Sequence, residues 1–173
     1  MNDVFVFHSK SADTAPGKGV HERVVDRARY ASLARVDNWR RVLSNFHVCP
    51  FEFRGLTYNT IEHAFQAHKI ALADPVKAKT FSVESGTELG LGDGTKAQRA
   101  RKLVRLTQAE LEEWDTMKDS LMAEAAVAKY KACQEARQVL KLTGDAELWH
   151  LMTQRGKPSQ CVRFIHLEHI RHM

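Results

Sequence analysis

The pattern of hydrophobic and polar positions predicts short strands near both ends of the chain and a hairpin near its middle. Apolar residues follow one another at 4–7 and, with Arg163 among them, predominate again at 162–165, which is typical of short strands. Between 51 and 58, apolar and polar residues alternate around Arg54-Gly55, and this predicts a β-hairpin.

Apolar residues that recur every three to four positions predict the helices. In chain order, we expect helices at 20–33, 59–73, 107–130 and 134–142. Capping boxes are expected where Asn59 precedes Glu62 and where Thr107 precedes Glu110. The remaining segments are expected to be a glycine-rich loop at 82–99 and short turns at 146–152 and 166–171. The fold class expected from this order is α+β, mainly α-helical, in a single compact domain over 1–173.

Composition fits a globular protein and excludes several other classes. The 173 residues are 43% hydrophobic and 27% charged, which excludes a disordered tail and a disulfide knot. No apolar run approaches the length of a transmembrane span, and the first residues do not resemble a secretory signal. The widely spaced Cys49, Cys133 and Cys161 predict reduced thiols in a cytoplasmic protein.

A modest positive charge favours an anionic partner. The chain has 26 Lys and Arg against 21 Asp and Glu, a formal net charge of +5. This balance suits a nucleotide, another small anion or nucleic acid. The nine histidines show no spacing typical of a metal site, so we expect no metal.

Three polar residues share one edge of the helix expected from Asn59. Glu62, Gln66 and Lys69 fall within about 60° of each other on a helical wheel, beside the apolar stripe. A lysine flanked by apolar residues can act as a nucleophile, and a nearby carboxylate can move protons. The alternative is that Glu62 only caps the helix and that Lys69 is a surface residue.

Two other segments have the composition of phosphate-binding loops. The sequence Arg40-Arg-Val-Leu-Ser-Asn-Phe46 offers two guanidinium groups, a hydroxyl, an amide and a ring that can stack on a base. Pro16-Gly-Lys-Gly19 resembles a phosphate nest, although it is not a Walker A motif. The alternative for the first segment is an ordinary turn before the hairpin.

An ordered set of motifs resembles the YbiA/NADAR family of N-glycosidases. The set covers about residues 40–150, and the order of its members is more specific than any one of them. Its members are Leu43-Ser-Asn-Phe-His-Val-Cys-Pro-Phe51, Gly55-Leu-Thr-Tyr-Asn-Thr-Ile-Glu-His63, Gln66-Ala-His-Lys69, Ala73-Asp-Pro-Val-Lys-Ala-Lys79, Trp114-x3-Lys118-x3-Met122, Ala128-Lys-Tyr130 and Leu142-Thr-Gly-Asp145.

The resemblance implies a compact, mostly helical fold, no metal or redox cofactor, and cleavage of an N-glycosidic bond to a phosphorylated ribose. Two substrate classes follow from it: early riboflavin-pathway intermediates, and ADP-ribose on the exocyclic amine of guanine in a nucleoside or nucleic acid. The riboflavin-type segment Asp-x-x-Trp-Gly is missing here, where Leu148-Trp-His150 and Arg155-Gly156 stand instead. Together with the additional segment Ser9 to Glu22, this favours the ADP-ribosyl-guanine class.

The resemblance also assigns roles to residues. Lys69 would be the nucleophile that forms a Schiff base, and Glu62 would move protons. The expected substrate-binding residues are Lys10, Lys18, Gly19, Glu22, Arg41, Ser44, Asn45, Phe46 and Trp114, with Trp114 equally suited to the core. The competing interpretations are a non-catalytic reader of nucleotide or ADP-ribose and a basic nucleic-acid-binding module, and no membrane partner is expected.

Overall fold

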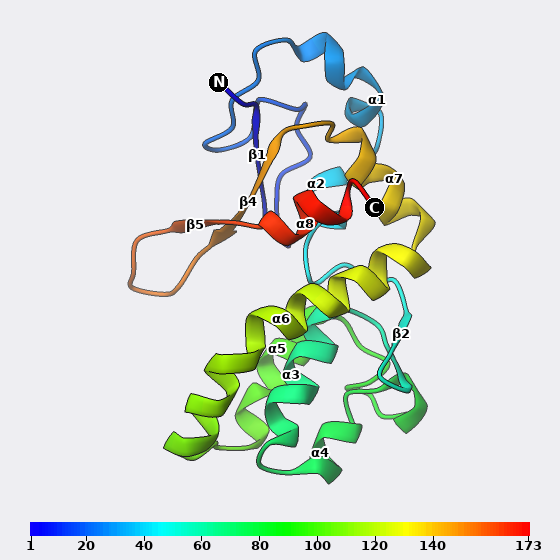
Figure 1. Ribbon diagram of the computed structural model, residues 1–173, viewed down its shortest axis with the longest axis vertical. Coiled ribbons are helices and arrows are strands. Elements are labelled where there is room, and N and C mark those ends of the chain that lie inside the picture. Colours follow the sequence, from blue (N-terminus) through cyan, green and yellow to red (C-terminus); the bar gives the residue numbers. More distant parts are fainter. The chain divides into compact units, whose positions relative to one another are not determined.

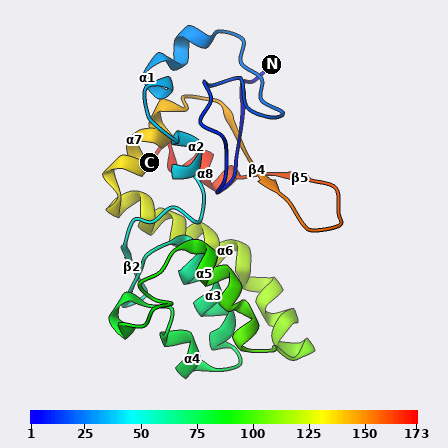
Figure 2. The same ribbon diagram turned by 180° about the vertical axis from the view of Figure 1, so that it is seen from behind.

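The chain divides into two compact units. The computed structural model describes residues 1–173, and unit 1 consists of 1–44 and 134–173. Unit 2 consists of 45–133 and is therefore inserted within unit 1 in the sequence. The prediction of a single compact domain over the whole chain stays a prediction, whereas the α+β, mainly helical fold class is confirmed (Figures 1 and 2).

Unit 1 contains a three-stranded sheet in the order β1-β4-β5. These strands are β1 (Val4–Phe7), β4 (Glu147–Met152) and β5 (Gln160–Arg163). β1 pairs in parallel with β4, and β5 pairs with β4 in the antiparallel direction. The turn expected at 146–152 is wrong, because this stretch forms the central strand and hydrogen-bonds to partners on both sides.

The helices of unit 1 are short and surround an aromatic core. They are η1 (Arg27–Tyr30), α1 (Ala31–Ala34), α2 (Trp39–Val42), α7 (Gln134–Leu142) and α8 (Ile165–Ile170). The Phe5 ring packs edge-on against Tyr30 and Trp39, at centroid distances of 4.9 Å and 5.1 Å. The expected helix at 20–33 forms only in its second half, because Arg23 in the first half pairs instead with the β1 backbone.

Unit 2 is built around α3 (Ile61–Ala71), which packs against α4 (Pro75–Lys79), α5 (Gly94–Arg99) and α6 (Gln108–Ala132). In both views of the ribbon, α3 runs beside α6 (Figures 1 and 2). The other elements of the unit are β2 (Phe51–Phe53), β3 (Leu56–Tyr58), η2 (Val83–Ser85) and η3 (Ala100–Leu103).

Two predictions for unit 2 are confirmed by its turns and caps. The hairpin β2–β3 turns at Arg54 and Gly55, whose φ angles of 50° and 89° are both positive. The capping box of α6 is present, with reciprocal hydrogen bonds between Thr107 and Glu110. The loop expected at 82–99 is wrong in its last third, because the Asp93 side chain caps a helix there, α5.

The cysteine prediction also needs correction. Cys49 and Cys133 form a disulfide, and only Cys161 is free. Their Cα atoms lie 6.2 Å apart although 84 residues separate them in sequence. Wide spacing along the chain therefore gave no information about which thiols meet in space. No helix of the protein combines the length and the apolar character that crossing a membrane requires.

Candidate functional site

The start of α3 leaves the Glu62 side chain free of a capping role. The N-cap is Thr60, whose hydroxyl accepts a hydrogen bond of 3.0 Å from the His63 backbone N–H. The His63 ring is held as well, by Thr60 Oγ1 at 2.7 Å and by the Leu89 carbonyl at 2.9 Å. The capping box expected from Asn59 and Glu62 is therefore wrong, since the helix begins one residue later and His63 stands where its glutamate would be.

The Glu62 carboxyl is buried among cationic and amide groups. The residue is 9% exposed, and burial raises the pKa of its carboxyl above the usual range. The Gln66 amide one turn later donates a hydrogen bond of 2.9 Å to Glu62 Oε1 and lowers that pKa, as do the nearby charges of Arg101 and Lys69. A carboxyl whose pKa is raised in this way keeps its proton to a higher pH than usual and can release it to a substrate.

Lys69 lies two turns after Glu62 on the same side of α3. Its side chain is half-buried, and its charge is close enough to lower the pKa of Glu62. The structure thus brings together the two predicted catalytic residues, with Gln66 between them.

Two buried amide oxygens beside Glu62 have no hydrogen-bond donor. Asn45 accepts a hydrogen bond of 3.0 Å from the Glu62 backbone N–H through its carbonyl, and its side-chain N–H contacts the Met122 sulfur at 3.4 Å. Asn45 Oδ1 and Gln66 Oε1 are both buried and unpaired. Because an unpaired buried acceptor costs about 1–3 kcal/mol, this arrangement suits a ligand that brings N–H or O–H donors.

The two aromatic candidates differ in exposure. Trp114 on α6 is 3% exposed and packs edge-on against Phe65 at a centroid distance of 4.9 Å. Its burial supports the core alternative. Phe46 is half-buried, and it lies so close to Gly94 that a Cβ there would come within 2.6 Å of its ring. Phe46 is therefore the better candidate for stacking on a base.

In unit 1, the Glu22 carboxylate occupies the nest that the sequence suggested for phosphate. Its oxygens accept hydrogen bonds of 3.0 Å from the backbone N–H groups of Gly17, Gly19 and Val6. Arg40 completes the arrangement, with bonds of 2.8 Å and 2.6 Å to the two oxygens. The nest holds an internal anion, and the phosphate role expected for Pro16–Gly19 stays a prediction.

The salt bridge between Glu22 and Arg40 accounts for the residue types at positions 19 and 22. Both side chains of the pair are almost fully buried, and the remaining N–H groups of Arg40 donate to the carbonyls of the preceding loop. A Cβ at Gly19 would lie 2.6 Å from the Glu22 carboxyl carbon. Gly19 and Glu22 therefore have structural reasons to be glycine and glutamate without any ligand.

The remaining cations predicted in unit 1 gather near a small cavity. The cavity is about 270 Å³ and includes His8, Ser11 and Lys18 in its wall. Burial lowers the pKa of His8, and the charges of the exposed Arg41 and Lys10 lower it further. Lys10, Lys18 and Arg41 thus lie around one edge of unit 1. Ser44, the last residue of the segment 1–44, is buried.

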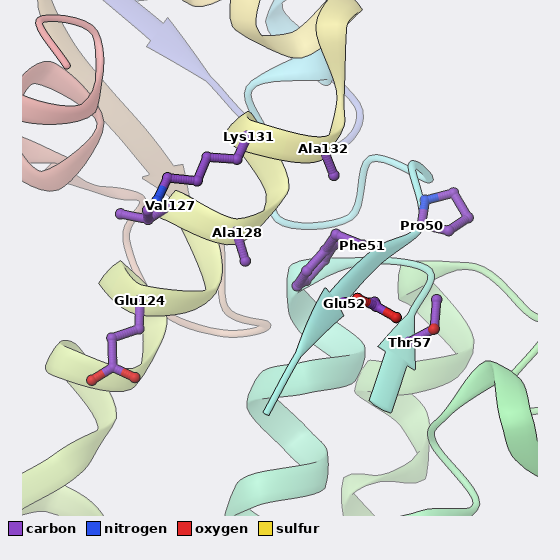
Figure 3. Close-up of a pocket in the computed structure, with 9 residues that line it drawn as sticks. All are labelled: Pro50, Phe51, Glu52, Thr57, Glu124, Val127, Ala128, Lys131 and Ala132. Carbon is purple, nitrogen blue, oxygen red and sulfur yellow. The ribbon is translucent and has the colours of Figure 1, made fainter. Parts of the chain in front are cut away.

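A larger hollow in unit 2 contains none of the predicted residues. It has a volume of about 580 Å³, with α6 on one side and the β2–β3 hairpin on the other (Figure 3). Of its two carboxylates, Glu124 is paired with Arg54 at 2.7 Å. The hollow has a wide mouth and both polar and apolar residues in its wall, and neither Glu62 nor Lys69 lines it.

Sequence reasoning missed Arg101 as part of the surroundings of Glu62. The residue lies on η3, within the stretch expected to follow a loop, and it acts on Glu62 through its charge. The signal available in the sequence was the run of basic residues from Lys96 to Arg105 with no acidic residue among them.

Comparison with known proteins finds similarity to a protein family and to a solved structure. A model of the NADAR domain family matches residues 34–154. Among solved structures, the chain is similar to the NMR structure of the E. coli protein YbiA, with 20% sequence identity and a TM-score of 0.48, over 87% of this chain and 68% of that one. The curated proteins include no match.

Proposed function

The chain belongs to the NADAR domain family, which includes N-glycosidases, and on this premise we propose that it is a hydrolase that cleaves an N-glycosidic bond to a phosphorylated ribose. The substrate we propose is ADP-ribose attached to the exocyclic amine of guanine, in a nucleoside, DNA or RNA. A cytoplasmic location and a reaction without metal or redox cofactor belong to the same proposal.

The observation that carries the proposal is the buried Glu62 beside Lys69. Glu62 does not cap its helix, and burial raises the pKa of its carboxyl. The buried Glu22 is neutralised by Arg40 in a salt bridge, whereas Glu62 forms no salt bridge and accepts a side-chain hydrogen bond only from Gln66. Its place next to an amine supports a role in moving protons.

The proposed reaction proceeds through a lysine Schiff base. The N-riboside opens to an imine at C1′, and the amine of Lys69 adds to that carbon while a proton passes from the attacking nitrogen to the imine nitrogen. The bond from C1′ to the guanine amine breaks, and the leaving amine takes a proton from Glu62. Water then adds to the protonated Schiff base, a proton returns to the Glu62 carboxylate, and ADP-ribose and the free lysine are released.

The unpaired amide oxygens support a role in orienting the sugar. We assign the ribose hydroxyls to Asn45 and Ser44 and a base to Phe46. Asn45 Oδ1 is buried without a donor, as hydroxyl recognition would require. We assign the pyrophosphate to Lys10, Lys18 and Arg41. These three exposed side chains lie around one edge of unit 1 and form no ion pairs.

Two alternatives remain distinct from this proposal. A riboflavin-pathway N-riboside would use the same Lys69 and Glu62, but the Asp-x-x-Trp-Gly segment of that class is absent. A non-catalytic reader of ADP-ribose would not need a buried carboxyl beside an amine. The first alternative changes the substrate, and the second removes the reaction.

The test is incubation with a guanine-ADP-ribosylated oligonucleotide and, separately, with early riboflavin-pathway intermediates, followed by mass analysis of the released sugar. We expect release of ADP-ribose from the oligonucleotide by the wild type and none by Lys69→Ala. Release from the riboflavin intermediates alone would overturn the proposed substrate. Binding without release from either would support the reader.

A further inference from the structure

A cluster of exposed cations lies next to the candidate catalytic pair in unit 2. The segment from Gly94 to Leu106 contains no acidic residue. Its cations are Lys96, Arg99, Arg101, Lys102 and Arg105, and all are exposed. Such a density of one charge, without interspersed acids, is what binding to a polyanion requires.

Most of these charges are not used within the fold. Lys96 is paired with Glu88 at 2.7 Å, and Arg101 donates one hydrogen bond of 2.8 Å to the carbonyl of Gln98. Arg99, Lys102 and Arg105 form no ion pair, although acidic residues follow soon after on α6. We call Arg99, Arg101, Lys102 and Arg105 the basic segment.

The basic segment belongs to elements that pack on the helix of the candidate site. Both α5 and η3 contact α3, which contains Glu62 and Lys69. The Arg101 charge acts on the Glu62 carboxyl itself. A chain of phosphates lying along the basic segment would therefore pass beside the residues that we propose to act on C1′.

We propose that the basic segment binds the phosphate backbone of a single-stranded nucleic acid whose modified guanine is the substrate. This inference rests on the proposed function, which identifies the modified guanine. It adds that this guanine is part of a single-stranded nucleic acid. In a duplex the exocyclic amine of guanine lies in the minor groove and pairs with cytosine, whereas a single strand presents it openly. Phosphate contacts position the strand, and the site on α3 selects the base.

Binding is measured by fluorescence anisotropy with an unmodified single-stranded oligonucleotide of about 12 nucleotides, over a range of salt concentrations. Each phosphate contact contributes about −0.7 to the slope of log K against log salt for single strands. We expect Arg99→Gln with Lys102→Gln to weaken binding and to make the slope less negative by about 1.4.

The matched control is Lys77→Gln with Lys79→Gln on α4. It removes two exposed lysines of the same unit and changes the net charge by the same amount. We expect this variant to bind like the wild type. Equal losses in the two variants, or no loss in either, would overturn the basic segment as the binding surface.

An anionic lipid surface is the other polyanion to distinguish, because Leu103 within the segment is 51% exposed. Wild-type protein that binds phosphatidylserine vesicles but not the oligonucleotide would overturn the proposal. A failure of the proposed function can be distinguished from a failure of the proposed binding surface. In that case no ADP-ribose is released from any substrate, whereas the anisotropy measurement still reports the binding surface.

A second measurement connects the surface to turnover. The ratio of kcat/KM for a modified oligonucleotide to kcat/KM for the modified nucleoside is expected to fall about tenfold or more in the basic-segment variant, since two phosphate contacts are lost. An unchanged ratio together with efficient turnover would show that the strand lies elsewhere.

Discussion

Gln66 donates a hydrogen bond of 2.9 Å to the carboxylate of Glu62, one turn before it on α3. The bond lowers the pKa of a carboxyl whose burial raises it, so the two residues together determine when Glu62 carries a proton. Gln66 is 5% exposed, and its own Oε1 has no donor. The amide is thus both a positioning group for Glu62 and a site at which a substrate donor can bind.

Removing the Gln66 amide should change the pH dependence of the reaction. In Gln66→Met the carboxyl loses the hydrogen bond that favours its ionised form, so the pKa of Glu62 rises further. The limb of the pH profile of kcat/KM that reports Glu62 should move to higher pH. Gln138→Met on the exposed side of α7 is the control, and an unmoved profile in Gln66→Met would show that Glu62 does not govern that limb.

Replacing Glu62 should separate catalysis from stability. Glu62→Gln is expected to slow turnover by about 100-fold or more, because the proton-transfer group is lost. The same change should raise thermal stability at alkaline pH, because it removes a carboxyl whose ionised form is disfavoured by burial. For a carboxyl whose folded pKa is raised, the wild type is favoured at low pH and loses stability as pH rises through that pKa.

The gain in Tm should therefore shrink when the same scans are run near pH 4. Normal turnover with unchanged stability at both pH values would reduce Glu62 to a structural residue.

A charge-preserving change at Lys69 should be as damaging as its removal. Lys69→Arg keeps the positive charge, but a guanidinium group stays protonated and cannot form the Schiff base. We expect loss of turnover in Lys69→Arg and of the adduct that borohydride traps on the wild-type protein. Lys77→Arg on α4 should behave like the wild type. Turnover by Lys69→Arg would exclude the Schiff base.

The buried pair in unit 1 should be a stability determinant. Glu22→Gln leaves Arg40 buried without its anion, and breaking such a pair costs about 3–5 kcal/mol. Chemical denaturation should show this loss, whereas Asp37→Asn, an exposed carboxylate of the same unit, should unfold like the wild type. Equal stability of the two variants would mean that the nest holds Glu22 with little net energy.

The disulfide should stabilise unit 2 through the length of chain that it closes. For the sequence separation of 84 between Cys49 and Cys133, the entropic contribution is about 4.5 kcal/mol. Cys49→Ser with Cys133→Ser should lower the denaturation midpoint, and reductant should then have no further effect. Cys161→Ser is the control, because that thiol is free. If reductant leaves the wild-type midpoint unchanged, the bond contributes nothing to stability.

Local signals in the sequence predicted the hairpin and the two longest helices of unit 2. The alternation around Arg54-Gly55 and the box formed by Thr107 and Glu110 depend on residues next to each other, so they could be read directly. The central strand β4 could not be read in this way. Its pairing with Val4 is set by a segment at the other end of the chain, and its own residues carry no clear alternation.

The site shows the same division. The helical spacing of Glu62 and Lys69 was enough to place them on one side of α3. The roles of Glu22 and Gly19 could not be predicted, because they depend on Arg40 filling a nest whose partners are scattered along the chain. The N-cap of α3 was expected at Asn59 but is Thr60. This shift of one residue rules out the alternative in which Glu62 only caps the helix.

The parallel pairing of β1 with β4 determines the order in which the chain can fold during synthesis. Val4 leaves the ribosome early, but its partner Glu147 is made only after all of unit 2. Unit 2 is contiguous in sequence, so it can fold while the first strand still waits. The long loop that β1 and β4 close makes the sheet of unit 1 the slow step, and the hydrophobic residues of β1 stay exposed until then.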